Sequence, residues 1–149
     1  MNHEAWLQQA ESDLAAASSS SNAGFHSQAV WFAAQVVEKG HKAILAALGL
    51  RYEDKHFKKL GHGTGEIAKL LPEALHQPID PRIAGMVAKL EERALSSRYP
   101  APGVGAAQLR APAAYMVGSQ EDVSDARELL EWCRSRVIRA TRAEQAMGP

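Results

Sequence analysis

Apolar residues recur at helical spacing along most of the chain, and no segment alternates with the period of two that a half-buried strand requires. The pattern predicts four long helices and one short helix, with expected ranges 5–17, 25–49, 64–71, 81–97 and 119–142. We therefore expect an all-α fold, an up-and-down helical bundle. A single domain covering 1–149 accommodates this length, with a tail that frays from about 143.

The second predicted helix is the most apolar one and carries a single polar stripe. Gln35, Glu38 and Lys42 follow one another at spacings of three and four residues, so they share a helix face. Trp31 lies on the same face, one turn earlier. Glu38 and Lys42 are also spaced for an ion pair along the helix, which alone would contribute only a few tenths of a kcal/mol. The stripe must either meet solvent or line a groove between helices or subunits.

Residues that disfavour helices divide the chain between these segments. The run 18–24 is rich in Ser and ends in Asn-Ala-Gly, which predicts a turn between two antiparallel helices. Asp80 and Pro81 are suited to the N-cap and the first position of the next long helix. The connection 98–118 contains several prolines and is long for a compact domain, which is typical of a functional or mobile segment.

Charge and cysteine content exclude several classes of protein. Acidic and basic residues balance at 17 each, so no bulk charge favours nucleic acid or an anionic membrane. Cys133 is the single cysteine, which excludes an internal disulfide and a cysteine-based zinc site. The sequence shows neither a signal peptide nor a stretch long enough to span a bilayer. We expect a cytoplasmic protein without a membrane partner.

An ordered set of residues resembles the HEPN domain (higher eukaryotes and prokaryotes nucleotide-binding). The set consists of Trp6, Asp13-Leu14, Phe25, Ala29, Phe32, Gln35, Glu38-Lys39, Lys42-Ala43, Gly61-His62, Arg98-Tyr99-Pro100 and Trp132. The resemblance spans nearly the whole chain. It implies a helical bundle that commonly forms a homodimer. It also implies a bacterial setting, either beside a minimal nucleotidyltransferase in a toxin–antitoxin pair or as a nucleotide-binding module.

Many members of that family are RNases that carry an Arg-x4-6-His motif near the start of the last long helix. Here no histidine follows Arg98, and the last one is His76. Arg51 and His56 satisfy the spacing, but they lie between the second and third predicted helices. Because the histidine would transfer the proton when a 2′-hydroxyl attacks phosphate, the sequence favours a binding module over a nuclease.

Five residues are the candidate ligand contacts. In the functional interpretation, Gln35, Glu38 and Lys42 face a cleft and meet nucleotide phosphate or base edges, while Arg98 and Tyr99 close it from the end of the fourth helix. In the structural alternative, Glu38 and Lys42 form a pair that fixes helix packing. Tyr99 then packs beneath the long connection and Arg98 caps helix carbonyls.

Other polar clusters carry weaker signals. Cations in 51–61 are typical of a solvated face. His56 and His62 lack a compact third ligand, and the glycines of 61–65 lack the strand and the Gly-Lys-Ser/Thr ending of a phosphate loop. Cys133 lies on an apolar helix face and is expected in the core. We expect no metal and no cofactor.

Three hypotheses remain from the sequence. The first is a nucleotide- or RNA-related binding module that also serves as partner of a nucleotidyltransferase. The second is a divergent, metal-independent RNase that combines Arg98 with a histidine from elsewhere, such as His41 or His62. The third is a structural partner that buries the stripe of the second helix in a dimer interface.

Overall fold

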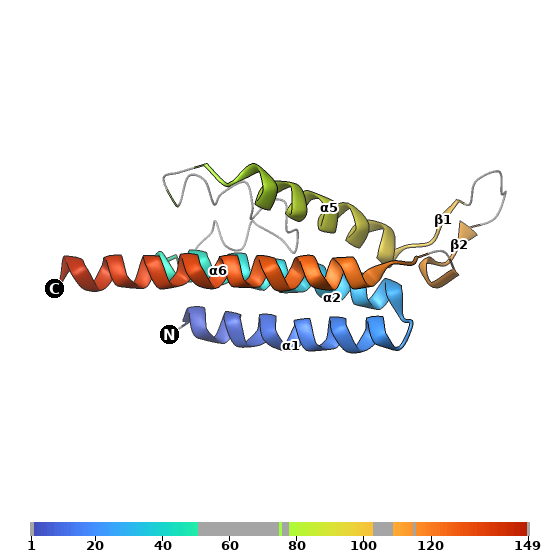
Figure 1. The fold of residues 1–149 in the computed structure, drawn as a ribbon, viewed down its shortest axis with the longest axis horizontal. Coiled ribbons are helices and arrows are strands. Elements are labelled where there is room, and N and C mark those ends of the chain that lie inside the picture. The colour runs from blue at the N-terminus through green and yellow to red at the C-terminus, as the bar shows by residue number, and fades with distance from the viewer. Residues whose placement is uncertain (1, 51–74, 76–77, 103–108, 115, 149) are drawn as a thin grey trace.

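A computed structural model describes residues 2–50, 75, 78–102, 109–114 and 116–148. Four long helices dominate this part of the chain: α1 (Asn2–Asn22), α2 (His26–Ala47), α5 (Pro81–Arg98) and α6 (Ser119–Met147). They form a bundle of roughly parallel and antiparallel rods (Figure 1). The predicted all-α class is confirmed. The short helix expected over 64–71 lies outside the described residues.

The first two helices form an antiparallel pair, but the turn between them is shorter than the sequence predicts. Helix α1 continues through the serine run to Asn22, and only Ala23 and Gly24 form the turn, with Gly24 at φ +81°. The prediction of a turn from residue 18 was wrong. Ser21 is buried and accepts a hydrogen bond from Ser119 on α6, so a tertiary contact outweighs the weak helix propensity of serine.

Helix α2 is the central element and packs against α1, α6 and α5. Its buried apolar residues meet those of the other three helices in one cluster, which contains Ala10, Ala17, Ala33, Val36, Val37, Ile83, Val87, Leu90, Val123, Ala126, Leu129 and Leu130. The contributions of α1 to the fully buried part of this cluster are alanines. Such small side chains let α1 and α2 lie close together along their length.

Helix α5 begins and ends near the predicted residues. The Asp80 side chain accepts from the backbone N–H of Arg82 at 2.8 Å, and Pro81 occupies the first turn. At the other end Tyr99 is extended, with φ −124° and ψ 140°, because the following Pro100 disfavours helical backbone. The buried residues of α5 follow a helical stripe that faces the core: Ile83, Val87, Leu90, Ala94 and Ser97.

The connection between α5 and α6 contains short regular elements that the sequence does not reveal. Strands β1 (Ala101–Pro102) and β2 (Leu109–Arg110) pair antiparallel, and a 3₁₀ turn, η1 (Pro112–Ala114), follows. Helix α6 then continues past Arg142 to Met147, with an exposed last turn. None of the described helices is long and apolar enough to cross a membrane.

Candidate functional site

The polar stripe of α2 lies against α1. Lys42 Nζ donates to Glu38 Oε1 at 2.7 Å, and both side chains are buried, with Glu38 only 1% exposed. Gln35 Nε2 donates to the second carboxylate oxygen of Glu38 at 3.4 Å. The ammonium of Lys42 lies 5.0 Å from the ring centroid of Trp6 on α1, a cation–π distance. The ion pair is therefore covered by α1 of its own chain.

Lys39 extends this network across the helix pair. Its ammonium donates to Gln35 Oε1 at 2.6 Å and lies 3.7 Å from Asp13 Oδ2 on α1. Gln9 Nε2 donates to the other oxygen of Asp13 at 3.0 Å. The spacing of Lys39 four residues after Gln35 could have indicated their contact. Its pairing with Asp13 depends on the rotation of α1 against α2, which the sequence pattern does not specify.

The structure thus brings Gln35, Glu38 and Lys42 together, as their spacing predicts. Removing two charges from water is costly, and the pair recovers this cost only when geometry and further hydrogen bonds are good. Both conditions hold here, so the network fixes how α1 lies on α2. The role of these three residues as ligand contacts stays a prediction.

Arg98 and Tyr99 lie in a different setting, at the end of α5. Both side chains are exposed, Tyr99 to 66%. Within the described residues, neither forms a hydrogen bond, ion pair or ring contact, and this exposure does not fit a Tyr99 packed beneath the connection. An arginine and a tyrosine with free side chains can meet a phosphate and the face of a base.

The structure does not bring the two sets of candidate residues together. Gln35, Glu38 and Lys42 lie along the interface of α1 and α2, whereas Arg98 and Tyr99 lie at the end of the bundle where α2 and α6 begin (Figure 1). We call this the open end. Large apolar side chains are also exposed in the elements that meet there: Phe25 at 61%, Leu95 at 58%, Leu109 at 67% and Val117 at 68%.

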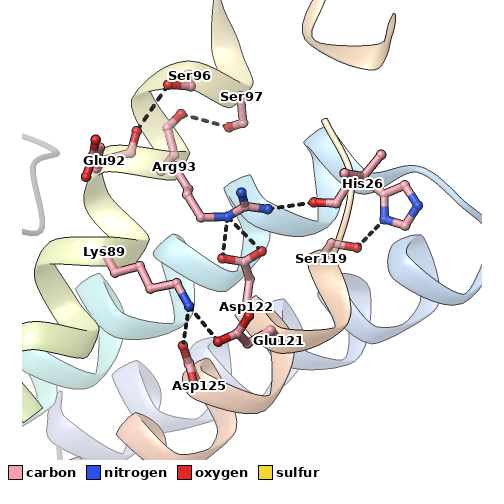
Figure 2. A network of polar contacts seen from close by, with 12 residues as sticks. His26, Lys89, Glu92, Arg93, Ser96, Ser97, Ser119, Glu121, Asp122 and Asp125 are labelled. Atoms are coloured by element: carbon pink, nitrogen blue, oxygen red, sulfur yellow. Dashed lines mark hydrogen bonds and ion pairs between the residues drawn. The ribbon is translucent and has the colours of Figure 1, made fainter. Parts of the chain in front are cut away.

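Arg93 and Asp122 connect α5 to α6 near the open end, as Figure 2 shows. Arg93 Nε lies 2.8 and 3.0 Å from the two carboxylate oxygens of Asp122. The Asp122 side chain is 2% exposed and that of Arg93 is 31% exposed. A terminal nitrogen of Arg93 also donates to the carbonyl of Val117 at 2.8 Å. The sequence does not reveal this pair, since no spacing rule relates side chains on two helices joined by a long connection.

Further ion pairs between α5 and α6 are more exposed. Lys89 Nζ lies 2.6 Å from Glu121 and 3.9 Å from Asp125, and Arg82 lies 2.5 Å from Glu128. The hydrogen bond between Lys89 and Glu121 raises the pKa of the lysine and lowers the pKa of the carboxyl. Exposed pairs of this kind contribute little to stability because water screens both charges.

A chain of hydrogen bonds joins the starts of α2 and α6 to the end of α1. Ser119 is fully buried, and its hydroxyl donates to Ser21 Oγ at 2.7 Å. His26 Nδ1 lies 2.6 Å from the same Ser119 oxygen and the imidazole is half-buried (Figure 2). The neutral tautomer that donates Nδ1–H to this oxygen has its acceptor nitrogen at Nε2. His26 was not singled out from the sequence.

The other candidate groups are buried or lie outside the described residues. Burial lowers the pKa of His41 to about 4, and its ring meets Trp132 edge-on with centroids 6.4 Å apart. Burial raises the pKa of the Cys133 thiol, which keeps it protonated in the core as expected. Residues 51–74, which include His56 and His62, are not described. Within the described ranges, no three His, Cys, Asp or Glu side chains form a group that could hold a metal ion.

A shallow groove of about 400 Å³ lies between α1 and α6. Its residues are Glu11, Leu14, Ala15, Ser18, Arg127, Leu130, Glu131 and Arg134. On its rim, Arg134 forms ion pairs with Glu11 and, at 2.7 Å, with Glu131. Because Arg134 is held by two carboxylates of its own chain, it is less available to a charged ligand than Arg98 at the open end.

Comparison with known proteins agrees with the architecture. The family model described as "HEPN domain" matches residues 3–138. The fold is also similar to that of a solved archaeal HEPN homologue, with a TM-score of 0.64 and 24% sequence identity over 91% of this chain and 97% of the other. At that identity the structural match supports the fold alone. No curated protein matches the sequence.

Proposed function

The chain belongs to the HEPN domain family, and on this premise we propose that it binds a nucleotide or single-stranded RNA at Arg98 and Tyr99. Membership carries a nucleotide- or RNA-related function in general. The observation that supports this site is the exposure of both side chains at the open end, without a partner in the described part of the chain. The charged groups of the α2 stripe, in contrast, are already paired.

The chemistry of the open end suits a nucleotide. The planar guanidinium of Arg98 can donate two hydrogen bonds to one phosphate, and Tyr99 offers an aromatic face for a base. Phe25, at the start of α2, adds a second exposed ring at this end. Stacking tolerates any base, so we expect modest sequence preference and binding that weakens as salt increases.

We propose an indirect role in this function for Gln35, Glu38 and Lys42. Their network fixes α2 against α1, and the first residue of α2 lies at the open end. A change in this network would then alter ligand binding through the position of α2. Direct contact with the ligand would require α1 to move away from the stripe.

The experiment that tests the site is a fluorescence-polarisation titration with a labelled single-stranded RNA of about ten nucleotides, a length within typical binding sites. Unlabelled ATP and CTP are competitors that separate nucleotide from RNA recognition. We expect Arg98→Ala and Tyr99→Ala each to weaken binding about tenfold, the value of a charged hydrogen bond or one stacked base. Arg139→Ala, an exposed arginine in the C-terminal half of α6, is the matched control and should bind as wild type. Equal binding by all four proteins would contradict the site.

We also propose that the protein forms a homodimer and pairs with a small nucleotidyltransferase in a bacterial toxin–antitoxin system. HEPN domains generally dimerise, which supports the first part. The second part is supported by the family's recurrent genomic setting. Light scattering of the purified chain tests the dimer. Co-expression with the protein encoded by the neighbouring reading frame tests the pair, and a neighbour that is not a nucleotidyltransferase would contradict it.

A second candidate function, a metal-independent RNase, is favoured by one observation. His26 is the first residue of α2 and Arg98 is the last of α5, so both lie at the open end, and His26 Nδ1 is 2.6 Å from the Ser119 hydroxyl. In the tautomer that donates from Nδ1, Nε2 is the proton acceptor. In this reaction the 2′-oxygen bonds to the adjacent phosphorus and the bond to the 5′-oxygen breaks. The 2′-hydroxyl proton passes to His26 Nε2, the 5′-oxygen takes a proton from water, and Arg98 neutralises charge on the phosphate. His41 is unsuited to this role because it is fully buried.

Cleavage of a generic RNA by the wild type, His26→Ala and Arg98→Ala separates the two functions. A binding module leaves the RNA intact in all three cases. An RNase loses activity in both variants by about a hundredfold or more. If His26→Ala retains full cleavage, histidine catalysis at this position is excluded.

A further inference from the structure

The connection between α5 and α6 leaves the bundle and returns to it at neighbouring points. It leaves at Arg98 and Tyr99 and returns at Val117, just before Gly118 enters the left-handed region at φ +72°. Between these points lie the β1–β2 ladder and η1. Arg93 on the last turns of α5 reaches the point of return, because its terminal nitrogen donates to the Val117 carbonyl at 2.8 Å.

Asp122 holds the same arginine from the α6 side. Its buried carboxylate accepts from Arg93 Nε at 2.8 and 3.0 Å, so one guanidinium binds α6 through Nε and the connection through a terminal nitrogen (Figure 2). The planar guanidinium fixes the angle between these two contacts. A lysine is a point charge on a flexible stem and cannot impose it.

The neighbouring ion pairs do not share this arrangement. Lys89 and Glu121 are 45% and 71% exposed, and among the described residues their hydrogen bonds and ion pairs join only the two helices. Arg82 and Glu128 are 65% and 45% exposed, farther along the same helices. Arg93 of α5, in contrast, hydrogen-bonds the residue just ahead of Gly118 and α6.

We propose that Arg93, anchored by Asp122, is a positioning residue that closes the base of this connection and thereby sets the affinity of Arg98 and Tyr99 for their ligand. The second half rests on the proposed function. Tyr99 is followed within two residues by β1, which is paired with β2, and β2 leads through η1 to Val117. Release of Val117 frees the far end of these contacts, and the backbone that presents Tyr99 is then held less firmly.

The test combines amide hydrogen exchange with RNA binding. Ala114 and Met116 donate backbone hydrogen bonds to Ala111 and Pro112 at 2.9 Å each, so their amides report the return of the connection without any ligand. The main variant is Arg93→Ala combined with Asp122→Asn, which removes both charges and avoids a buried carboxylate without a counter-ion. Arg93→Lys retains the charge alone. Lys89→Ala, which removes an ion pair between the same two helices, is the matched control.

We expect the double variant to accelerate exchange at Ala114 and Met116 about tenfold or more, with α2 amides unchanged, because the opening is local. Its affinity for the labelled RNA of the binding test should fall about fivefold. Arg93→Lys should also show faster exchange at Ala114 and Met116 and weaker RNA binding, each to a smaller extent than the double variant. Lys89→Ala should show neither.

Unchanged exchange at Ala114 and Met116 in the double variant would overturn the closure of the connection, whatever happens to binding. Faster exchange with unaltered RNA affinity would overturn the positioning role. Faster exchange at every amide, α2 included, would also overturn it, since Arg93 would then act on global stability. If the wild type binds no RNA or nucleotide, the proposed function and the effect on affinity fall together, while the exchange data still decide whether Arg93 closes the connection.

Discussion

The interface of α1 with α2 and the open end of the bundle use similar residue types in opposite ways. In the interface, Lys42, Glu38 and Gln35 are bonded to one another and covered by an indole ring. At the open end, Arg98 and Tyr99 extend into solvent. A charge that is satisfied within the fold contributes to structure, whereas one without an internal partner is available to a ligand. Mutations in the first region should therefore act mainly on stability and reach binding only through the position of α2, whereas mutations in the second should act on binding directly.

The largest expected effect comes from breaking the buried ion pair. Lys42→Met leaves the Glu38 carboxylate, 1% exposed, without its ammonium partner, and should lower the free energy of unfolding by about 3 kcal/mol. Glu38→Gln combined with Lys42→Met removes both charges and should return to within about 1 kcal/mol of wild type. Urea unfolding followed by circular dichroism measures both. Equal destabilisation by the single and double variants would show that packing, not charge, dominates this interface.

A pH titration of stability probes the buried His41, whose ring meets Trp132 of α6. Burial lowers its folded pKa to about 4, below the ordinary 6.5 of the unfolded chain. Above pH 6.5 both states are neutral. Between 6.5 and 4 only the unfolded state gains the proton, so stability falls with falling pH by about 3 kcal/mol in total. His41→Gln should flatten this part of the profile, and an identical slope in that variant would assign it to other groups.

Close packing between α2 and α6 predicts a smaller loss of stability when a methyl group is added there. A Cβ on Gly40 would lie 2.8 Å from Cys133 Sγ and 3.2 Å from Cys133 Cβ. Gly40→Ala should therefore cost about 2 kcal/mol, as overpacked cores do. Adding Cys133→Ala removes the sulfur and should recover part of that loss in the same thermal melts. An unchanged melting temperature in Gly40→Ala would mean that α2 and α6 can move apart at little cost.

The open end should respond least in stability. Arg98→Ala and Tyr99→Ala should each change the free energy of unfolding by no more than about 0.5 kcal/mol, as expected for exposed residues that have no partner in the described part of the chain. The same proteins should bind the labelled RNA less tightly. A loss of stability comparable to that of Lys42→Met would place Arg98 or Tyr99 among the structural residues and end the contrast between the two regions.

Local patterns in the sequence predict most of the helical framework and part of the candidate site. The capping pair Asp80-Pro81, the stop at Tyr99-Pro100 and the shared face of Gln35, Glu38 and Lys42 each depend on residues a few positions apart. The helical course of 18–21 was missed because the buried contact of Ser21 comes from α6.

The covering of the stripe by α1 and the Arg93–Asp122 contact could not be predicted for a similar reason. Both depend on how one helix is rotated against another, and periodicity does not encode that rotation. The sequence pattern therefore predicts the helices but not the contacts between residues that are distant in the sequence.

The hydrogen bond from Ser119 to Ser21 spans 98 positions of the chain and has a consequence for the order of folding. The pair α1–α2 is joined by a two-residue turn, so it closes a very short loop and can form early. Helix α6 is the last to leave the ribosome, and until it docks, α2 exposes the apolar face that Leu129 and Leu130 later cover. Synthesis that stalls before residue 119 would therefore release α1, α2 and α5 without the helix that covers this face of α2, a fragment prone to self-association.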